Sequence, residues 1–268
     1  MKDIIAWELK RRRSTILWWT IGSLLLTFVI LALFPSIRDK ANQLNQVLDQ
    51  MPSSLRGLKT GGAASINVGD PAQFLNSQLF YITLPMIWII LAITRGAGIL
   101  GKEERDHTLE LLLARPISRG RLLLGKALAF GAEYSIVTLV SLAFILFVAP
   151  IYDIHISSSS LALATIYTAL FSLSFGYLAF CLQAANTLTK RAATALAVAL
   201  SFGGYIIASL SSLTDWLKTP SKFVPYHYFN PLDILQSKTP RGLLIYMAAI
   251  FVFGSLLAYV GFRRRDIE

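Results

Sequence analysis

The chain has 268 residues, of which 54% are hydrophobic and 15% charged, and its mean hydropathy is +0.57. Soluble globular domains carry about 25% charged residues, so this composition excludes an ordinary soluble enzyme and predicts an integral membrane protein. The net charge of +10 does not indicate nucleic-acid binding, because the basic residues flank apolar segments and do not gather on one soluble face. The single cysteine, Cys181, excludes a disulfide within the chain and a Cys-rich metal site.

The first segment, MKDIIAWELKRRR, places apolar residues among charges directly before a long apolar run. This pattern favours an N-terminal interfacial helix in the lipid headgroup layer, with its arginines toward anionic lipid. A simple charged cap on the first membrane helix is the alternative.

Six apolar runs follow, and each is close to the ~17–25 residues that cross a bilayer core. Backbone groups in lipid must form their hydrogen bonds within the segment, so each run is expected to be a helix. We therefore expect an all-α membrane protein with one transmembrane domain over residues 1–268. The spans are predicted at residues 14–34, 79–100, 122–149, 161–185, 192–213 and 243–262.

The distribution of basic residues predicts the orientation of these spans. Seventeen of the 25 lysines and arginines lie in residues 1–13, 95–126, 190–191 and 263–265. The loops between them contain fewer basic residues for their length, so the positive-inside rule places both termini in the cytoplasm.

Two segments are then expected on the outside. After the first span, apolar residues at helical spacing predict a short amphipathic helix; they are Ile37, Ala41, Leu44, Leu48, Met51 and Leu55. Before the last span lies an aromatic, proline-rich loop that contains Trp216, Phe223, Tyr226, Tyr228, Phe229, Pro220, Pro225 and Pro231. This loop is expected to be either a partly re-entrant gate or an aromatic belt at headgroup level.

Small residues recur at four-residue spacing in the fourth and fifth spans. Ser172 and Gly176 share one face of the fourth span, while Ala195, Ala199 and Gly203 share one face of the fifth. Small side chains let helices approach closely. Both faces are therefore expected to form helix contacts within the bundle or in a dimer.

The segment 101–126, GKEERDHTLELLLARPISRGRLLLGK, is the most charged stretch between two spans. Leu109, Leu112 and Leu113 form an apolar stripe at i, i+3 and i+4. Glu103 and Glu104 favour a helix N-terminus through its dipole, and Pro116 favours the end of that helix. A short cytoplasmic helix between the second and third spans is predicted.

This segment resembles the E-E-x-x-G-T-x-E-x-L-L-x-x-P-[VI]-S-R signature of ABC type-2 (ABC-2) permeases, the membrane subunits of ATP-driven exporters. His107 stands where that family usually has Gly. The resemblance implies that the segment 101–120 is a coupling helix that transmits movement from an ATPase. The residues implied in coupling are Glu103, Glu104, Thr108, Glu110, Leu112, Leu113, Arg115, Pro116 and Arg119.

The resemblance also implies the protein's partners. ATP and Mg²⁺ would be bound by a separate ABC ATPase subunit, and this chain would contain no catalytic residue, metal or cofactor of its own. A second permease chain, identical or homologous, would complete the translocation pathway in the plasma (inner) membrane. Drugs, antibiotic peptides, lipids and glycans are the cargo classes expected.

Two other motifs are weaker. Residues 96–102, GAGILGK, match the skeleton of a phosphate-binding loop, but Glu103 replaces the Ser/Thr that would hold Mg²⁺. Glu103 and Glu104 with His227 are similar to motifs of CAAX-type intramembrane metalloproteases, but Thr108 replaces a required arginine. The predicted topology also separates these glutamates from His227, so an intramembrane hydrolase is only the alternative from another class.

Glu133 lies inside the third apolar run, where an acidic group costs about 2.5–3.5 kcal/mol on insertion scales. It is therefore expected to face a partner or a cavity, in either a functional or a packed structural role. A stand-alone carrier would need such a charge. Gln183 and Arg95 lie near cytoplasmic ends of spans and are expected to be interfacial.

Overall fold

The computed structural model describes residues 2–50, 67–98, 119–185, 188–211 and 214–263, and these residues contain helices and no strand. Six helices are long and apolar enough to cross a membrane. The prediction of a six-span, all-α membrane protein is confirmed. The spans are α1 (Lys2–Asp39), α4–η1–α5 (Pro71–Gly96), α8 (Arg119–Val148), α9 (Ser158–Ala184), α10 (Lys190–Leu210) and α13 (Arg241–Arg263).

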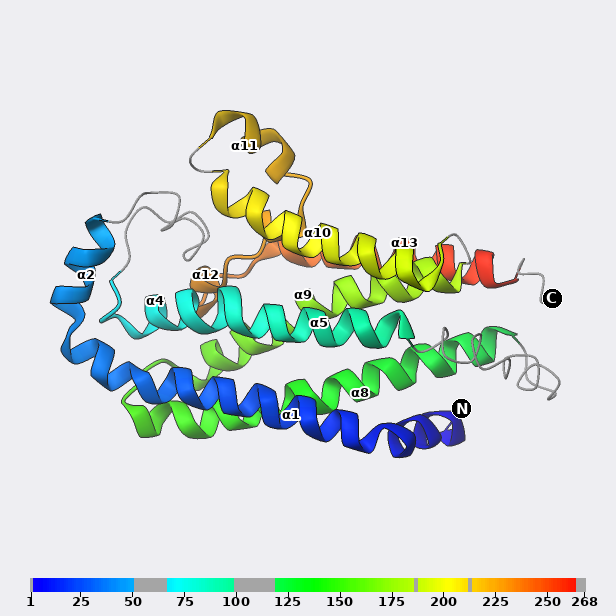
Figure 1. Ribbon diagram of the computed structural model, residues 1–268, viewed down its shortest axis with the longest axis horizontal. Helices are drawn as coiled ribbons and strands as arrows, with labels where there is room; N and C mark the ends of the chain where they lie inside the picture. The colour runs from blue at the N-terminus through cyan, green and yellow to red at the C-terminus, as the bar shows by residue number, and fades with distance from the viewer. Residues whose placement is uncertain (1, 51–66, 99–118, 186–187, 212–213, 264–268) are drawn as a thin grey trace.

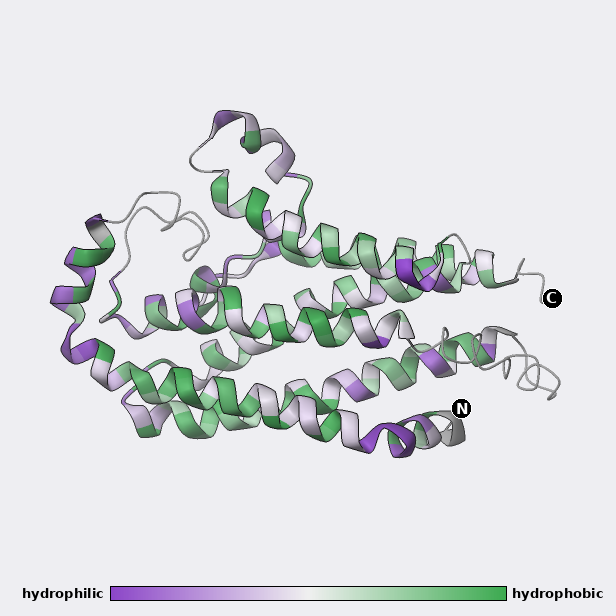
Figure 2. Ribbon diagram, viewed as in Figure 1, coloured by the Kyte–Doolittle hydropathy of each residue, from purple (hydrophilic) through white to green (hydrophobic). Residues whose placement is uncertain are grey.

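The spanning helices run side by side along the long axis of the molecule (Figure 1). α9 is central and packs against α5, α8, α10 and α13, while α1 packs mainly along α8. The chain ends lie at one end of the bundle, and α2 (Ala41–Gln50) lies at the other (Figure 1). Figure 2 shows apolar residues along the helices and a polar stretch near the start of α1.

α1 is a single helix of 38 residues. The N-terminal basic segment, expected as a separate helix in the headgroup layer, forms the first part of α1. Within this segment Glu8 is buried, whereas Lys10, Arg11 and Arg13 are exposed. Contacts with the rest of the bundle therefore hold this segment in line with the first span.

The second spanning helix begins earlier than its hydropathy predicts. Asp70 caps α4 (Pro71–Leu75) by accepting a hydrogen bond from the backbone N–H of Gln73 at 3.3 Å. A π-helical segment, η1 (Asn76–Thr83), then joins α4 to α5 (Leu84–Gly96). The three residues directly before the predicted start are polar, but two of them, Asn76 and Ser77, are buried.

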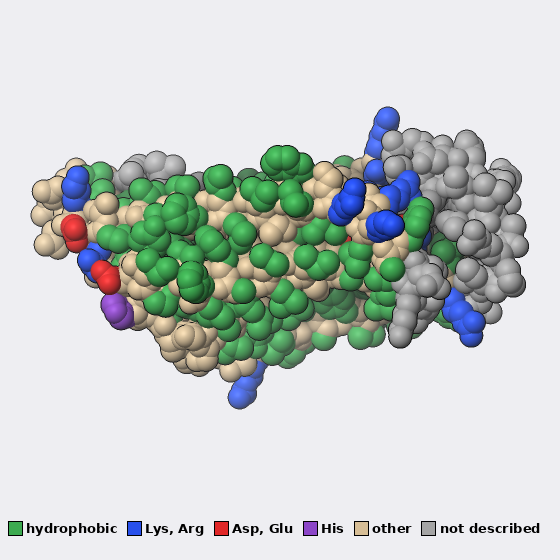
Figure 3. Space-filling model, turned by 90° about the horizontal axis from the view of Figure 1, so that it is seen from below, with side chains coloured by type: hydrophobic (Ala, Val, Ile, Leu, Met, Phe, Trp, Pro, Cys, Tyr) green, Lys and Arg blue, Asp and Glu red, His purple; other side chains and the backbone are tan. Residues whose placement is uncertain are grey.

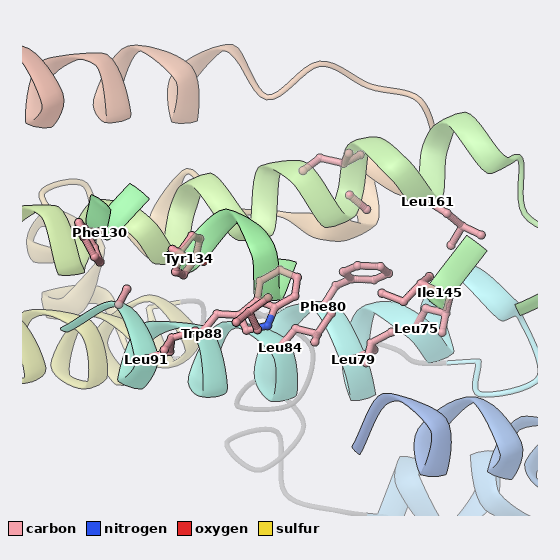
Figure 4. Close-up of a cluster of buried hydrophobic side chains, with 14 of the residues drawn as sticks. Leu75, Leu79, Phe80, Leu84, Trp88, Leu91, Phe130, Tyr134, Ile145 and Leu161 are labelled. Carbon is pink, nitrogen blue, oxygen red and sulfur yellow. The ribbon is translucent and has the colours of Figure 1, made fainter. Parts of the chain in front are cut away.

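A hydrophobic cluster joins the second, third and fourth spans, as Figure 4 shows. At its centre the Trp88 indole N–H donates to the hydroxyl of Ser23 at 3.1 Å, and the Ser23 and Ser141 hydroxyls lie 3.1 Å apart. Polar side chains between helices contribute about 0.6 kcal/mol each in membranes. This relay ties α5, α1 and α8 together within the apolar core.

Glycine permits the closest helix contact in the bundle. A Cβ on Gly176 of α9 would lie 2.4 Å from the backbone of Ala92, and a Cβ on Gly96 would lie 2.1 Å from the carbonyl oxygen of Gly176. Real Cβ contacts are not that short, so α5 and α9 touch through their backbones. The expected packing role of Gly176 is explained by this contact with α5.

The two predicted external segments contain helices. The amphipathic segment includes α2, and the aromatic loop contains α11 (Asp215–Ser221), η3 (Pro225–His227) and α12 (Pro231–Leu235), while η2 (Ala149–Tyr152) follows α8. Tyr226 and Phe229 are buried, and Phe229 stacks on Phe171 of α9 with ring centroids 4.1 Å apart. Trp216 and Phe223 remain 71% and 75% exposed. The loop thus has a part that folds back into the bundle and a part that faces outward.

Replacing Gly176 with alanine should separate α5 from α9. Overpacking costs about 1–3 kcal/mol, so the thermal midpoint of unfolding in detergent should fall. Gly131→Ala in α8 is the matched control, because no atom lies within 4 Å of the Cβ position there. Equal midpoints for the two variants would contradict the close contact.

Candidate functional site

The predicted coupling residues border two helices that the structure describes. Glu103, Glu104, Thr108, Glu110, Leu112, Leu113, Arg115 and Pro116 lie outside the described residues, and Arg119 is the first residue of α8. α5 ends at Gly96 before this segment, and α8 begins after it. The charged side chains of α5 and α8 are therefore the described groups nearest to it in the chain.

Glu133 of α8 forms a two-point ion pair with Arg95 of α5. The Arg95 Nε donates to Glu133 Oε2 at 2.7 Å, and Arg95 Nη2 donates to Oε1 at 2.9 Å. Both side chains are buried. The planar guanidinium matches the carboxylate at two points, which fixes orientation as well as distance.

A second pair joins α1 to α8. Lys126 Nζ donates to Glu8 Oε1 at 2.5 Å, and both residues are 1% exposed. Arg12 links the two pairs, since its Nε lies 3.4 Å from Glu8 Oε2 and 3.9 Å from Glu133 Oε1. We call Glu8, Arg12, Arg95, Lys126 and Glu133 the ionic cluster.

Trp7 covers the outer side of this cluster. The Lys126 ammonium lies 5.6 Å from the Trp7 ring centroid, and the Arg11 guanidinium lies 4.8 Å from it. An aromatic face attracts cations at these distances. Trp7 thus shields Lys126 from solvent and also favours its charge.

Helical spacing explains why these residues meet. Glu8 and Arg12 are four residues apart and share a face of α1, whereas Lys126 and Glu133 are seven apart and share a face of α8. Arg95 comes from the last turn of α5. Two carboxylates and three cations leave the cluster with a formal charge of +1.

The cluster holds three helices together at the level where α5 ends. A buried ion pair is weak evidence for net stability, but removing one partner costs about 3–5 kcal/mol because the other charge stays buried. The ion pairs therefore favour one relative position of α1, α5 and α8. The stretch of α8 that follows Glu133, from Tyr134 to Val148, contains no charged residue.

The alternative of an intramembrane metalloprotease, with Glu103, Glu104 and His227, gains no support from this arrangement. No group of three His, Cys, Asp or Glu residues that could hold a metal occurs among the described residues. Tyr226, the neighbour of His227 in the chain, lies against Gly204 of α10. At a rise of 1.5 Å per residue, Gly204 is about 21 Å along α10 from Lys190. Lys190 in turn lies near Gly98, at the end of α5. His227 is therefore far from Gly98, the last described residue before Glu103 in the chain.

The small residues of α10 divide between two faces. Ala193, Ala197 and Gly204 are buried, whereas Ala195 and Ala199 are exposed. Gly203 continues the four-residue spacing of Ala195 and Ala199, and no atom lies within 4 Å of its Cβ position. We call Ala195, Ala199 and Gly203 the outward stripe. Among the residues that the structure describes, none packs closely against Gly203 of this stripe, and its alanines remain exposed.

Sequence reasoning identified Glu133 but not its partners. Arg95 was expected at the interface, and the roles of Glu8, Arg12 and Lys126 were not predicted. The four-residue spacing of Glu8 and Arg12 could have indicated a buried face, because it places opposite charges on one side of an otherwise basic helix. Gln183, expected to be interfacial, is also buried.

A family model described as "ABC-2 family transporter protein" matches residues 3–267. A search of curated proteins found no match. The family match extends well beyond the charged segment, to the ionic cluster and all six spans.

Removing Arg95 should destabilise the protein more than removing an exposed cation. Arg95→Met leaves Glu133 buried without its main partner and should cost about 3–5 kcal/mol of unfolding free energy. The double variant Arg95→Met/Glu133→Met should recover much of that loss. Thermal unfolding in detergent measures both effects.

The control for this prediction is the exposed pair of Lys218 and Asp215, which lie 2.7 Å apart. Lys218→Met should change the midpoint little, because exposed pairs contribute about 0–1 kcal/mol. If Lys218→Met and Arg95→Met lower the midpoint equally, the ionic cluster does not hold the helices together.

Proposed function

The chain belongs to the ABC-2 transporter family, and we propose that it is the permease subunit of an ATP-driven exporter. The observation that carries this proposal is the family match over residues 3–267. The six spanning helices fit a membrane-embedded transport subunit. The finer steps of coupling and export are inferences from the signature segment and from the ionic cluster.

In this proposal the segment 101–120 receives movement from a cytoplasmic ATPase. Glu103, Glu104, Thr108, Glu110, Leu112, Leu113, Arg115, Pro116 and Arg119 are the residues proposed to couple the two proteins. The helices on either side of the segment are joined by Arg95 and Glu133. A displacement of the segment would therefore reach α5 and α8 together, and through Glu8 and Arg12 it would reach α1.

The ATPase is proposed to be a separate chain that binds ATP and Mg²⁺. The basic segments define the cytoplasmic side under the positive-inside rule, with both termini on that side of the plasma (inner) membrane. ATP-driven closure of the ATPases would then open the pathway outward. The aromatic loop before α13, whose Tyr226 and Phe229 are buried among the helices, is the proposed external part of that pathway.

A second permease chain is proposed to pack against α10. The outward stripe of Ala195, Ala199 and Gly203 has the four-residue spacing that lets two membrane helices approach closely. A single chain of six helices encloses little space, so a pathway at the interface of two chains fits the family. The partner is identical or homologous.

The structure gives the alternatives less support. Glu133 is paired at two points with Arg95, so it is not available as the free intramembrane charge that a stand-alone carrier would need. The Nδ1 atom of His227 lies 3.4 Å from the Ser221 hydroxyl oxygen. His227 is far from the end of α5, and this separation disfavours an intramembrane hydrolase.

The coupling proposal predicts that Leu112→Asp abolishes binding of the partner ATPase. The chain would be solubilised in detergent and purified together with the ATPase encoded beside it. Wild type should yield a stoichiometric complex, and Leu112→Asp should lose it because a charge disrupts the apolar stripe.

Leu44→Asp in α2 is the matched control, since it makes the same change at the opposite end of the bundle. It should retain the ATPase. If the wild-type preparation contains no ATPase, the permease proposal is contradicted, and a stand-alone carrier or a hydrolase becomes the better explanation.

The dimer proposal predicts cross-linking through α10. The native Cys181 is buried, so Ala199→Cys supplies an exposed thiol on the outward stripe. Oxidation in membranes should give a covalent dimer if the partner is identical. Phe253→Cys in α13, at a 70% exposed position, should not; equal cross-linking of both variants, or of neither, would contradict an α10 homodimer.

A further inference from the structure

An open groove lies on the outer surface between α1 and α8, apart from the ionic cluster. Its volume is about 530 Å³. The side chains that matter here are Arg13, Leu17, Thr20 and Ile21 of α1 with Ile136 and Val140 of α8. Figure 3 views this side of the molecule and shows a broad apolar belt with lysines and arginines gathered toward one end.

Arg13 differs from the two arginines that precede it. Arg11 stacks on Trp7, and Arg12 turns inward to Glu8 and Glu133. Arg13 is exposed, lines the groove and has no acidic partner among the described residues. A cation is therefore available at one end of an otherwise apolar groove.

Along the rest of the groove no described side chain has a free hydrogen-bond donor for a polar ligand. The Thr20 hydroxyl donates to the carbonyl oxygen of Ile16 at 2.8 Å, so its hydrogen bond is already made within α1. Leu17, Ile21, Ile136 and Val140 are exposed apolar side chains. The occupant must therefore be apolar along most of its length and anionic at one end.

The length of the groove along α1 matches the depth of one leaflet of a bilayer. Arg13 is the last charged residue before the apolar run at residues 14–34, so it lies at the headgroup level. From Arg13 to Ile21 the helix rises about 12 Å at 1.5 Å per residue. Half of a hydrocarbon core of about 30 Å is about 15 Å, the depth of an acyl chain.

We propose that this groove binds one anionic phospholipid from the leaflet on the N-terminal side. Its phosphate is held by the guanidinium of Arg13, and an acyl chain lies along Leu17 and Ile21 against Ile136 and Val140. The proposal needs only that the chain spans a membrane, and it does not depend on coupling to an ATPase.

A second copy of the chain fits this face less well. A two-fold axis along the membrane normal would bring Arg13 of both copies to the same depth, with exposed Lys10 and Arg11 nearby. From Ile5 to Ile21 and along all of α8, the acidic residues are Glu8 and Glu133, and both are buried in the ionic cluster. No acidic group on these stretches is free to compensate the like charges.

The test is native mass spectrometry of the purified chain with added palmitoyl-oleoyl phosphatidylglycerol or phosphatidylcholine. Wild type should bind one phosphatidylglycerol in preference to phosphatidylcholine. Arg13→Gln should weaken phosphatidylglycerol binding about fivefold, the effect expected for one cation near a membrane surface. Arg11→Gln removes the same charge two residues away and should keep the preference.

Filling the groove tests its apolar part. Ile136→Trp and Val140→Trp should each remove bound lipid of both kinds while the thermal midpoint stays close to that of wild type. Using two sites guards against one variant failing to fold. Binding of the partner ATPase, measured on the same variants, should be unchanged, which separates failure here from failure of the permease proposal.

Three results would overturn the proposal. The first is equal binding of phosphatidylglycerol and phosphatidylcholine by wild type. The second is an equal loss of phosphatidylglycerol binding in Arg11→Gln and Arg13→Gln. The third is a wild-type dimer that Ile136→Trp or Val140→Trp splits into monomers without a change in bound lipid, since that would assign the groove to a second copy.

Discussion

Charges removed from water must be compensated nearby, and in this protein that requirement sets the arrangement of three helices. Glu8 and Glu133 are buried between helices, and each is paired with a cation from a different helix. Separating either carboxylate from its partner would leave a buried charge unpaired, at a cost of several kcal/mol. α1, α5 and α8 therefore meet at one point, while their apolar faces and the hydrogen bonds from Trp88 through Ser23 to Ser141 complete the contact farther along.

This arrangement gives the proposed coupling segment a defined attachment. Both of its flanking helices enter the cluster, one through Arg95 and the other through Lys126 and Glu133. Near the same end of α5, the backbone contact with Gly176 fixes α9, the central helix. These close contacts leave little room for one helix to slide past its neighbour, so we expect α1, α5, α8 and α9 to move as a group.

The six spans were predictable because lipid imposes both a length and a helical hydrogen-bond pattern on each apolar run. The need of Glu133 for a partner was predictable for the same reason. The identity of that partner was not, because hydropathy placed Arg95 at the edge of one span and Glu133 inside another. They meet only because α5 ends beside the middle of α8, and such an axial offset between helices is set by packing at positions like Gly96 and Gly176. The split of the aromatic loop into buried Tyr226 and exposed Phe223 likewise depends on tertiary contacts.

The position of Glu133 along α8 has a mechanical consequence. α8 is continuous from Arg119 to Val148, and Glu133 lies near its midpoint, so the helix has two arms of about 21 Å on either side at 1.5 Å per residue. The neutral hydrogen bond between the Ser23 and Ser141 hydroxyls, farther along, is weaker than the charged contact at Glu133. Because α1 packs along α8, a tilt about Glu133 would carry both helices, and a tilt of about 10° would move each end of α8 by about 4 Å in opposite directions. Under the proposed coupling, a push at the Arg119 end would therefore emerge at the Val148 end as a movement in the opposite direction.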